Sequence, residues 1–116
     1  MPKFIFVYLG GEFPASPAES QKHFQKYQQW LGSLGDAVIS PAIPFKDTHT
    51  IQPNGTANPG TMSSISGMSI IQFNSMQEAV KIAQSCPFLE INGTLEISEM
   101  VEMANDLDSG NSKNIN

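Results

Sequence analysis

One run of residues near the N-terminus limits the folds open to this chain more than any other feature. Residues 3–9, KFIFVYL, are apolar or aromatic at every position after the lysine, over the length of a β-strand. A strand with one face in water alternates apolar and polar residues, whereas this run is apolar on both faces. Gly10, Gly11 and Pro14 end it. We therefore expect a strand that is covered from two sides, and any fold must supply both covering layers.

The next segment carries several agreeing signals for a helix. Ser16 can cap the N-terminus, Pro17 suits the first helical position, and Glu19 completes a capping box. The helix is expected to run to about Leu34 and to end at Gly35. Its apolar stripe, spaced by three and four residues, consists of Phe24, Tyr27, Trp30, Leu31 and Leu34.

The rest of the chain reads as further strands and one more helix. The expected elements are a short strand at 36–40 ended by Pro41, a strand at 67–74, a helix at 76–85 with a second capping box at its start, and two short strands at 88–91 and 94–97 around an Asn92-Gly93 turn, the second continuing to Met103. Residues 41–61 are rich in Pro, Gly, Asn and Thr. They are expected to form a long loop with one irregular strand near residues 49–52.

This order of elements predicts an α+β fold with the ferredoxin-like βαββαβ arrangement, in one domain spanning residues 1–103. Two helices cover only one face of a four-stranded sheet, so the second apolar face needs another partner. A second copy of the chain is the simplest candidate, which predicts a homodimer paired through the sheet face. Residues 104–116 have almost nothing to bury and are expected to form a disordered C-terminal tail.

Charge and composition argue against several classes of partner. The net charge is −5 and all six basic residues are lysine, so we expect neither nucleic acid nor membrane as a partner. Cys86 is the only cysteine, and the two histidines lack metal-ligand spacing, so no metal site is expected. No dinucleotide fingerprint and no flavin or haem ligand pattern is present, so we expect no cofactor. The apolar run is too short for an export signal, which makes the cytoplasm the expected location.

Four stretches resemble a known family. KFIFVYLGGEFP, SPAESQKHFQKYQQWLGSLGDAV, SGMSIIQF and SCPFLEINGTLEISEM are together similar to YCII-related domain proteins, over nearly all of residues 2–103. The resemblance implies a ferredoxin-like fold paired into a dimeric α+β barrel. It implies little about activity, because most members have no established reaction. In better-studied members a histidine on the first helix and a nearby aspartate are proposed as an active-site dyad, which match His23 and Asp36 here. Where many relatives carry a histidine after the Cys-Pro step, this chain has Phe88.

His23 is the first candidate site residue, because it falls on the helix line of Tyr27, Trp30 and Leu34 rather than on the solvent side. An imidazole held near the sheet can act as a general base near neutral pH. Its other interpretation is a structural histidine, hydrogen-bonded at the edge of the core. Asp36 would either orient His23 or serve as a plain turn residue between helix and strand.

Two further residues are candidate ligand-binding groups. Tyr8 ends the first strand, where its hydroxyl would line a pocket mouth or simply reach water from an aromatic ring in the core. Glu99 projects to the apolar face if the last strand alternates regularly, and a carboxylate there would have a raised pKa. A bulge at Ser98 would instead return Glu99 to solvent.

Two functions remain open from the sequence. The first is a small-molecule-binding or accessory dimer with a pocket between the first helix and the sheet, and with the 41–61 loop as its lid. The alternative is an enzyme of the dimeric α+β barrel type that uses His23 as general acid or base on a small metabolite. Replacing His23 would separate the two, because an enzyme would lose turnover and keep its fold.

Overall fold

The computed structural model describes residues 1–12 and 14–101 of the chain. Its elements are β1 (Lys3–Gly10), α1 (Pro17–Leu34), the 3₁₀ helix η1 (Gly35–Ala37), β2 (Val38–Pro44), β3 (His49–Ile51), β4 (Ala57–Pro59), β5 (Ile65–Gln72), α2 (Met76–Ala83), the 3₁₀ helix η2 (Pro87–Ile91) and β6 (Gly93–Glu99). The expected tail at 104–116 lies outside the described residues. The last strand ends at Glu99 and residues 100–101 are not part of it, so its expected continuation to Met103 is wrong. Within them, no helix is long and apolar enough to cross a membrane.

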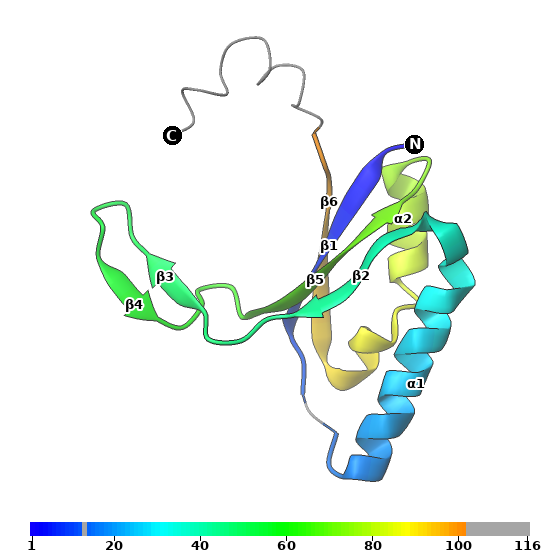
Figure 1. The fold of residues 1–116 in the computed structure, drawn as a ribbon, viewed down its shortest axis with the longest axis horizontal. Helices are drawn as coiled ribbons and strands as arrows, with labels where there is room; N and C mark the ends of the chain where they lie inside the picture. Colours follow the sequence, from blue (N-terminus) through cyan, green and yellow to red (C-terminus); the bar gives the residue numbers. More distant parts are fainter. Residues whose placement is uncertain (13, 102–116) are drawn as a thin grey trace.

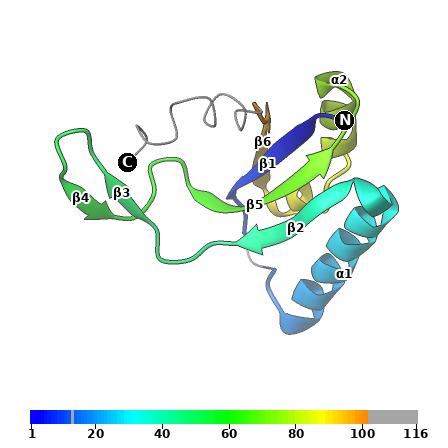
Figure 2. The same cartoon turned by 45° about the horizontal axis from the view of Figure 1, so that its top comes forward.

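The main sheet has four strands in the order β2-β5-β1-β6, and every neighbouring pair is antiparallel. α1 connects β1 to β2 with β5 between them, and α2 connects β5 to β6 with β1 between them. These are two interlocked split βαβ units, which confirms the predicted α+β, ferredoxin-like fold. Both helices lie on the same side of the sheet, as Figures 1 and 2 show.

Local sequence signals account for where the helices begin. The Ser16 side chain accepts a hydrogen bond from the backbone N–H of Glu19, and Ser75 accepts one from Glu78. Each cap satisfies a backbone donor that the helix leaves without a partner, a contribution of about 1 kcal/mol. Pro17 occupies the first turn of α1, where its missing N–H costs nothing. Both predicted capping serines are therefore confirmed.

The core lies between the sheet and the two helices. On β1 the alternation is regular: Phe4, Phe6 and Tyr8 are buried, whereas the residues between them are half-buried. The other buried apolar residues of the core are Trp30, Ile71, Phe73, Ala79, Ala83 and Cys86. Full burial of one such phenylalanine or isoleucine stabilises the fold by roughly 1.5–3 kcal/mol. The fully buried face of β1 is thus the face of the sheet that α1 and α2 cover.

The opposite face of the sheet is also apolar at its centre. Ile5 and Val7 of β1 pair with Ile70 and Met68 of β5, and all four side chains are half-buried. Neither helix lies on this face (Figure 2). The apolar character of both faces of β1 is therefore confirmed, and the predicted pairing of two copies through this face stays a prediction.

Three parts of the chain differ from the expectations. The strand expected at 88–91 is wrong: these residues form η2, which begins at Pro87 and ends where Asn92 adopts a left-handed conformation, with φ of 62°. β2 is longer than predicted and contains Pro41 and Pro44, which it tolerates as an edge strand with an irregular register. The long loop contains the hairpin of β3 and β4, which projects away from the main sheet (Figure 1).

Candidate functional site

A cleft of about 420 Å³ opens between the N-terminal part of α1 and the sheet. α1 lines it with Ser20, His23, Phe24 and Tyr27; the sheet with Tyr8, Ala42, Ile43, Pro44, Ser66 and Gly67; and the flanking segments with Pro14, Phe88 and Ile91. Its volume falls within the range of small-molecule sites. None of these lining side chains is a carboxylate, a lysine or an arginine. The cleft is therefore a mostly apolar space with a few polar groups.

The course of α1 creates this space. Toward its C-terminal end the helix packs on the core, where Trp30 is only 8% exposed. Toward its N-terminal end it leaves the sheet (Figure 1), and Phe24 is 57% exposed. His23 and Tyr27 lie four residues apart, on the same helix face, and both are half-buried. The sequence pattern that predicted one continuous apolar stripe thus describes a helix that covers the core with one end and the cleft with the other.

On the sheet side, the cleft is lined by two small residues of β5, Ser66 and Gly67. A Cβ atom added to Gly67 would lie 2.8 Å from the carbonyl oxygen of Ile43, a distance that folded proteins do not show. Glycine at this position therefore allows β2 and β5 to approach each other at the base of the cleft. Ser66, its neighbour, donates a hydrogen bond to the Tyr8 carbonyl oxygen at 3.1 Å.

Phe88 closes one end of the cleft. Its ring packs edge-on against Tyr8, with ring centroids 5.1 Å apart. A Cβ atom on Gly93 would lie 2.1 Å from the same ring, so the ring rests directly on the backbone of β6. At the position where the resemblance leads one to look for a histidine, this chain has an apolar wall.

A chain of three hydroxyl groups runs from the core to the cleft. The Tyr8 hydroxyl lies 2.7 Å from the Ser69 hydroxyl and is also hydrogen-bonded to the Tyr27 hydroxyl. Burial is the largest cause of a raised pKa at Tyr8 and at Tyr27. Both phenols are consequently neutral at physiological pH, and they act in the site as hydrogen-bond donors and acceptors.

The structure places the predicted site residues as follows. His23 and Tyr8 both line the cleft, which brings them to one place. Asp36 lies on η1, beyond the C-terminal end of α1, and is exposed. Between His23 and Leu34 alone, α1 rises about 16 Å, at ~1.5 Å per residue. Within one chain the two halves of the expected dyad are therefore kept apart by the length of α1.

Glu99 lies far from the cleft. It pairs with Phe4 at one end of β1, whereas Tyr8 is four residues further along, roughly 13 Å at the rise of a strand. The register with β1 runs without a shift through Ser98, so the alternative with a bulge at that residue is wrong. Because Glu99 pairs with the buried Phe4, it lies on the helix-facing side of the sheet. Its side chain is nevertheless exposed, because β6 ends at this residue.

Sequence reasoning missed Tyr27, Ser69 and Phe88 as parts of the site. Tyr27 was assigned to the apolar stripe, although its spacing of four from His23 already placed the two side by side. Ser69 is a small polar residue in a strand whose alternation buries that position, and it is 0% exposed. A buried hydroxyl needs a partner, which is the signal that could have pointed to Tyr8.

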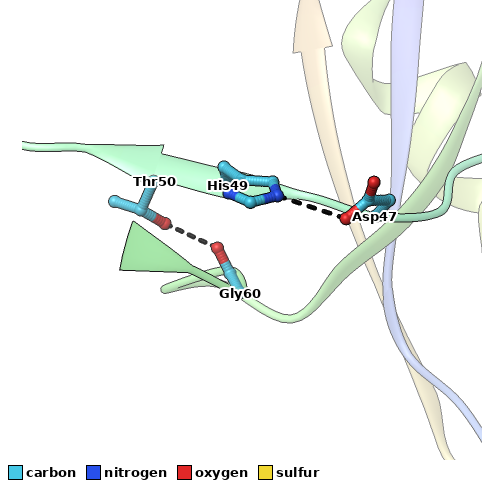
Figure 3. A network of polar contacts seen from close by, with 4 residues as sticks. All are labelled: Asp47, His49, Thr50 and Gly60. Carbon is cyan, nitrogen blue, oxygen red and sulfur yellow. Dashed lines mark hydrogen bonds and ion pairs between the residues drawn. The ribbon is translucent and has the colours of Figure 1, made fainter. Parts of the chain in front are cut away.

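The second histidine forms its own pair away from the cleft. His49 Nε2 lies 3.2 Å from an Asp47 carboxylate oxygen at the base of the β3–β4 hairpin, and both side chains are exposed (Figure 3). Beside them, Thr50 donates a hydrogen bond to the Gly60 carbonyl oxygen at 2.8 Å, which ties the two strands together. Of the 41–61 segment that was expected to form a lid, residues 42–44 line the cleft as part of β2. No residue of the hairpin lines the cleft, so the hairpin is not closed over it.

Residues 1–12 and 14–101 contain no cluster of three or more His, Cys, Asp and Glu side chains suited to a metal ion. Cys86 is buried, and burial raises the pKa of its thiol to about 11. It is therefore a neutral thiol packed in the core beneath the site.

Comparison with known proteins supports the fold. No family model and no curated protein matches the chain. Among solved structures, it is similar to 5-chloro-2-hydroxyhydroquinone dehydrochlorinase from Burkholderia phenoliruptrix AC1100 in complex with 2,5-dihydroxybenzoquinone, with a TM-score of 0.54 and 12% identity, over 85% of this chain and 94% of that one. That enzyme has the dimeric α+β barrel fold. At this identity the likeness concerns the fold alone.

Proposed function

We propose that this protein binds an uncharged small molecule with a largely apolar body in the cleft between α1 and the sheet. The observation that carries the proposal is the cleft itself: about 420 Å³, lined by apolar and aromatic side chains, with His23 and Tyr27 facing it from one helix. Small-molecule sites have this composition, an apolar wall with a few polar groups that fix the orientation. The similar fold holds a small cyclic compound in the dehydrochlorinase complex.

The lining also favours neutral ligands over charged ones. A charged group moved from water into an apolar cleft costs free energy unless an opposite charge meets it. Lys26 and Glu90 form an ion pair, 2.9 Å apart and more than half exposed, and neither residue lines the cleft. Neutral compounds therefore bind without an uncompensated charge.

A thermal-shift screen of neutral and charged metabolites tests this proposal. A ligand that binds only the folded state raises the melting temperature by mass action. We expect stabilisers among neutral cyclic compounds and none among their carboxylate or amine analogues of equal size. A screen in which only charged compounds stabilise the protein, or none does, would overturn it.

A second candidate function, catalysis, is favoured by the position of His23. Its imidazole lines the cleft, where it can take a proton from a bound molecule or deliver one. Asp36 lies beyond the far end of α1, so this role is proposed for His23 without it. Each compound found in the screen can be incubated with the protein and with His23→Gln. A product that forms only with the wild-type protein supports catalysis, whereas unchanged compounds in both samples support binding alone.

We further propose that two copies pair through the open face of the sheet, as the resemblance to YCII-related proteins implies. The half-buried Ile5, Val7, Met68 and Ile70 support this, since an apolar sheet face that no helix covers gains stability when a second copy excludes water from it. The cleft lies on the opposite, helix-bearing side, so pairing leaves it open to a ligand.

A further inference from the structure

The β3–β4 hairpin has one mostly apolar face and one polar face. Its three cross-strand pairs are His49 with Pro59, Thr50 with Asn58, and Ile51 with Ala57. Directly opposed residues of an antiparallel pair share a face, and successive residues alternate between faces. The first and third pairs therefore lie together on one face, and the second pair lies on the other. We call the mostly apolar face, formed by the first and third pairs, the arm face.

The arm face is open to solvent in a single chain. β3 and β4 form a two-stranded sheet of their own, and every residue of the two strands except Thr50 is exposed. Ile51, the largest apolar side chain of the arm face, is 64% exposed. A hairpin of two strands is only marginally stable in water unless its apolar face packs against something. The arm face therefore needs a partner that residues 1–12 and 14–101 of the same chain do not supply.

The hairpin lies away from the helices, where the sheet is uncovered. In both views the hairpin and the two helices lie at opposite ends of the protein, with the sheet between them (Figures 1 and 2). A second copy packed on the open face of the sheet thus comes within reach of the hairpin. In a twofold-symmetric pair every contact occurs twice, so each hairpin then reaches the other copy.

The open sheet face needs additional contact area. Its apolar strip consists of the four residues of β1 and β5 described above and is only two strands wide. On either side of it, β6 contributes Glu96 and Ser98, and β2 contributes Ser40. The four apolar side chains are half-buried, so together they expose less than the roughly 800 Å² that each partner contributes to a stable interface. The arm face adds exposed apolar surface to this interface.

The edge of the hairpin is less suited to docking than its face. The Gly60 N–H donates to the Thr48 carbonyl oxygen at 2.7 Å, and the Gln52 N–H donates to the Thr56 carbonyl oxygen at 2.8 Å. Gly60 and Thr56 therefore direct their backbone groups toward β3, so by alternation those of Pro59 point outward. Proline has no N–H, which interrupts the row of donors along this edge. Side-chain contact through the arm face is thus favoured over the addition of a strand.

From this we propose, resting on the pairing proposed above, that the hairpin is an arm whose apolar face packs on the second copy beside the shared sheet interface. Hydrogen bonds within the hairpin give it a defined shape for this contact. The Asn54 side chain accepts a hydrogen bond from the Thr56 N–H at 3.0 Å in the turn, and the Thr50 hydroxyl joins the two strands at Gly60. The dimer then contains two such arms.

Two substitutions that add the same charge to opposite faces of the hairpin test the arm. Ile51→Asp places a carboxylate on the arm face, and Asn58→Asp places one on the polar face. Both residues are exposed, so both variants should fold. The dimer dissociation constant is measured by sedimentation equilibrium. We expect it to rise at least about tenfold in Ile51→Asp, because each arm loses an apolar contact, and to stay within about twofold in Asn58→Asp.

A mixed dimer gives a second measurement that needs no variant. Isotope-labelled and unlabelled copies are combined, and isotope-filtered NMR detects only contacts between the two copies. We expect contacts between the Ile51 methyl groups of the labelled copy and protons of the unlabelled one.

The outcomes separate the arm from the pairing on which it rests. A dimer that shows no contact from the Ile51 methyl groups to the other copy overturns the arm and leaves the pairing through the sheet. The same conclusion follows if Ile51→Asp and Asn58→Asp change the dissociation constant equally. A monomeric wild type overturns both the pairing and the arm. Ligand binding in the cleft is measured by its own screen, so no result at the hairpin decides it.

Discussion

The hydroxyl of Tyr8 on β1 is hydrogen-bonded to the hydroxyl of Tyr27 on α1, and this contact joins the sheet to the helix at the inner wall of the cleft. It lies where the helix begins to leave the sheet. The core below it is closed by Trp30, whereas the space beyond it is open. The pair therefore marks the boundary between the part of α1 that stabilises the fold and the part that forms the site.

The Tyr8 hydroxyl should matter more for stability than the Tyr27 hydroxyl. Tyr8→Phe removes the hydrogen-bond partner of the buried Ser69 hydroxyl and should cost about 1–3 kcal/mol in the free energy of unfolding. Tyr27→Phe removes a hydroxyl from a half-buried residue that lines the cleft, where water can replace the lost partner, and should cost less than about 1.5 kcal/mol. Urea denaturation of both variants checks the order, which a larger loss for Tyr27→Phe would contradict.

Stability should fall in alkaline solution. The folded-state pKa of the Cys86 thiol is raised from 9.0 to about 11 by burial, and burial raises the pKa of Tyr8 and Tyr27 as well. The unfolded chain therefore releases these protons at lower pH than the folded chain does. The stability is complete below about pH 9 and is lost as the pH rises through the folded pKa values, at up to ~1.4 kcal/mol per pH unit for each group.

The free energy of unfolding measured at pH 7, 9 and 10.5 shows this slope, and Cys86→Ala removes the thiol's share of it. A wild-type stability that stays level from pH 9 to pH 10.5 would contradict the assignment of these groups as buried and neutral.

Gly93 should be sensitive to the smallest substitution. A methyl group in Gly93→Ala meets the Phe88 ring at 2.1 Å, so the ring must leave its place against Tyr8. We expect a loss of about 1–3 kcal/mol in the free energy of unfolding, which is typical of overpacking. Gly32→Ala is the matched control, because nothing lies within 4 Å of its added methyl group on exposed α1.

Because alanine is the better helix former, Gly32→Ala should stabilise the protein by roughly 0.5–1 kcal/mol. Urea denaturation measures both variants. Equal effects of the two substitutions would show that the Phe88 ring is not held on the backbone of β6.

The proposed dimer can be disrupted at the centre of the open sheet face. Val7→Lys places a positive charge between Met68 on β5 and Glu96 on β6. In the monomer the Glu96 carboxylate is a neighbour of opposite charge for the new lysine, whereas in the dimer the charge would interrupt the apolar face. Gln29→Lys, on the exposed side of α1, adds the same charge elsewhere. Light scattering after size-exclusion chromatography should give a dimer for the wild type and Gln29→Lys and a monomer for Val7→Lys. A monomeric wild type would contradict the pairing.

Much of the fold could be predicted because its signals are local. The capping serines and the apolar run of β1 act within a few residues, and the structure has the strand and both helix starts where the pattern placed them. The prediction of a strand at 88–91 is wrong because Asn-Gly pairs are also typical of hairpin turns. Here the segment is a short 3₁₀ helix that begins at Pro87 and ends at the left-handed Asn92, and its Phe88 ring packs on the backbone of Gly93.

The site was less accessible from the sequence because it depends on contacts between distant residues. Helical spacing placed His23 on the inner face of α1, and the cleft lies there. The contact of Tyr27 with Tyr8 joins residues 19 positions apart, and that of Tyr8 with Ser69 joins residues 61 positions apart. No local pattern reports such pairs. Asp36 follows the same helix but lies beyond its far end, a separation that the predicted helix length already implied.

The most direct test of the small-molecule site is to fill the cleft and measure binding again. Ala42 lines the cleft from β2, and Ala42→Leu occupies part of its volume; Ala57→Leu, exposed on β4 and outside the lining, is the matched control. A compound from the metabolite screen is titrated into both variants, and amide chemical shifts report where it binds. The account predicts shifts at cleft residues such as His23 and Tyr27, at least a tenfold loss of affinity in Ala42→Leu and none in Ala57→Leu. Undiminished binding to a well-folded Ala42→Leu would contradict it.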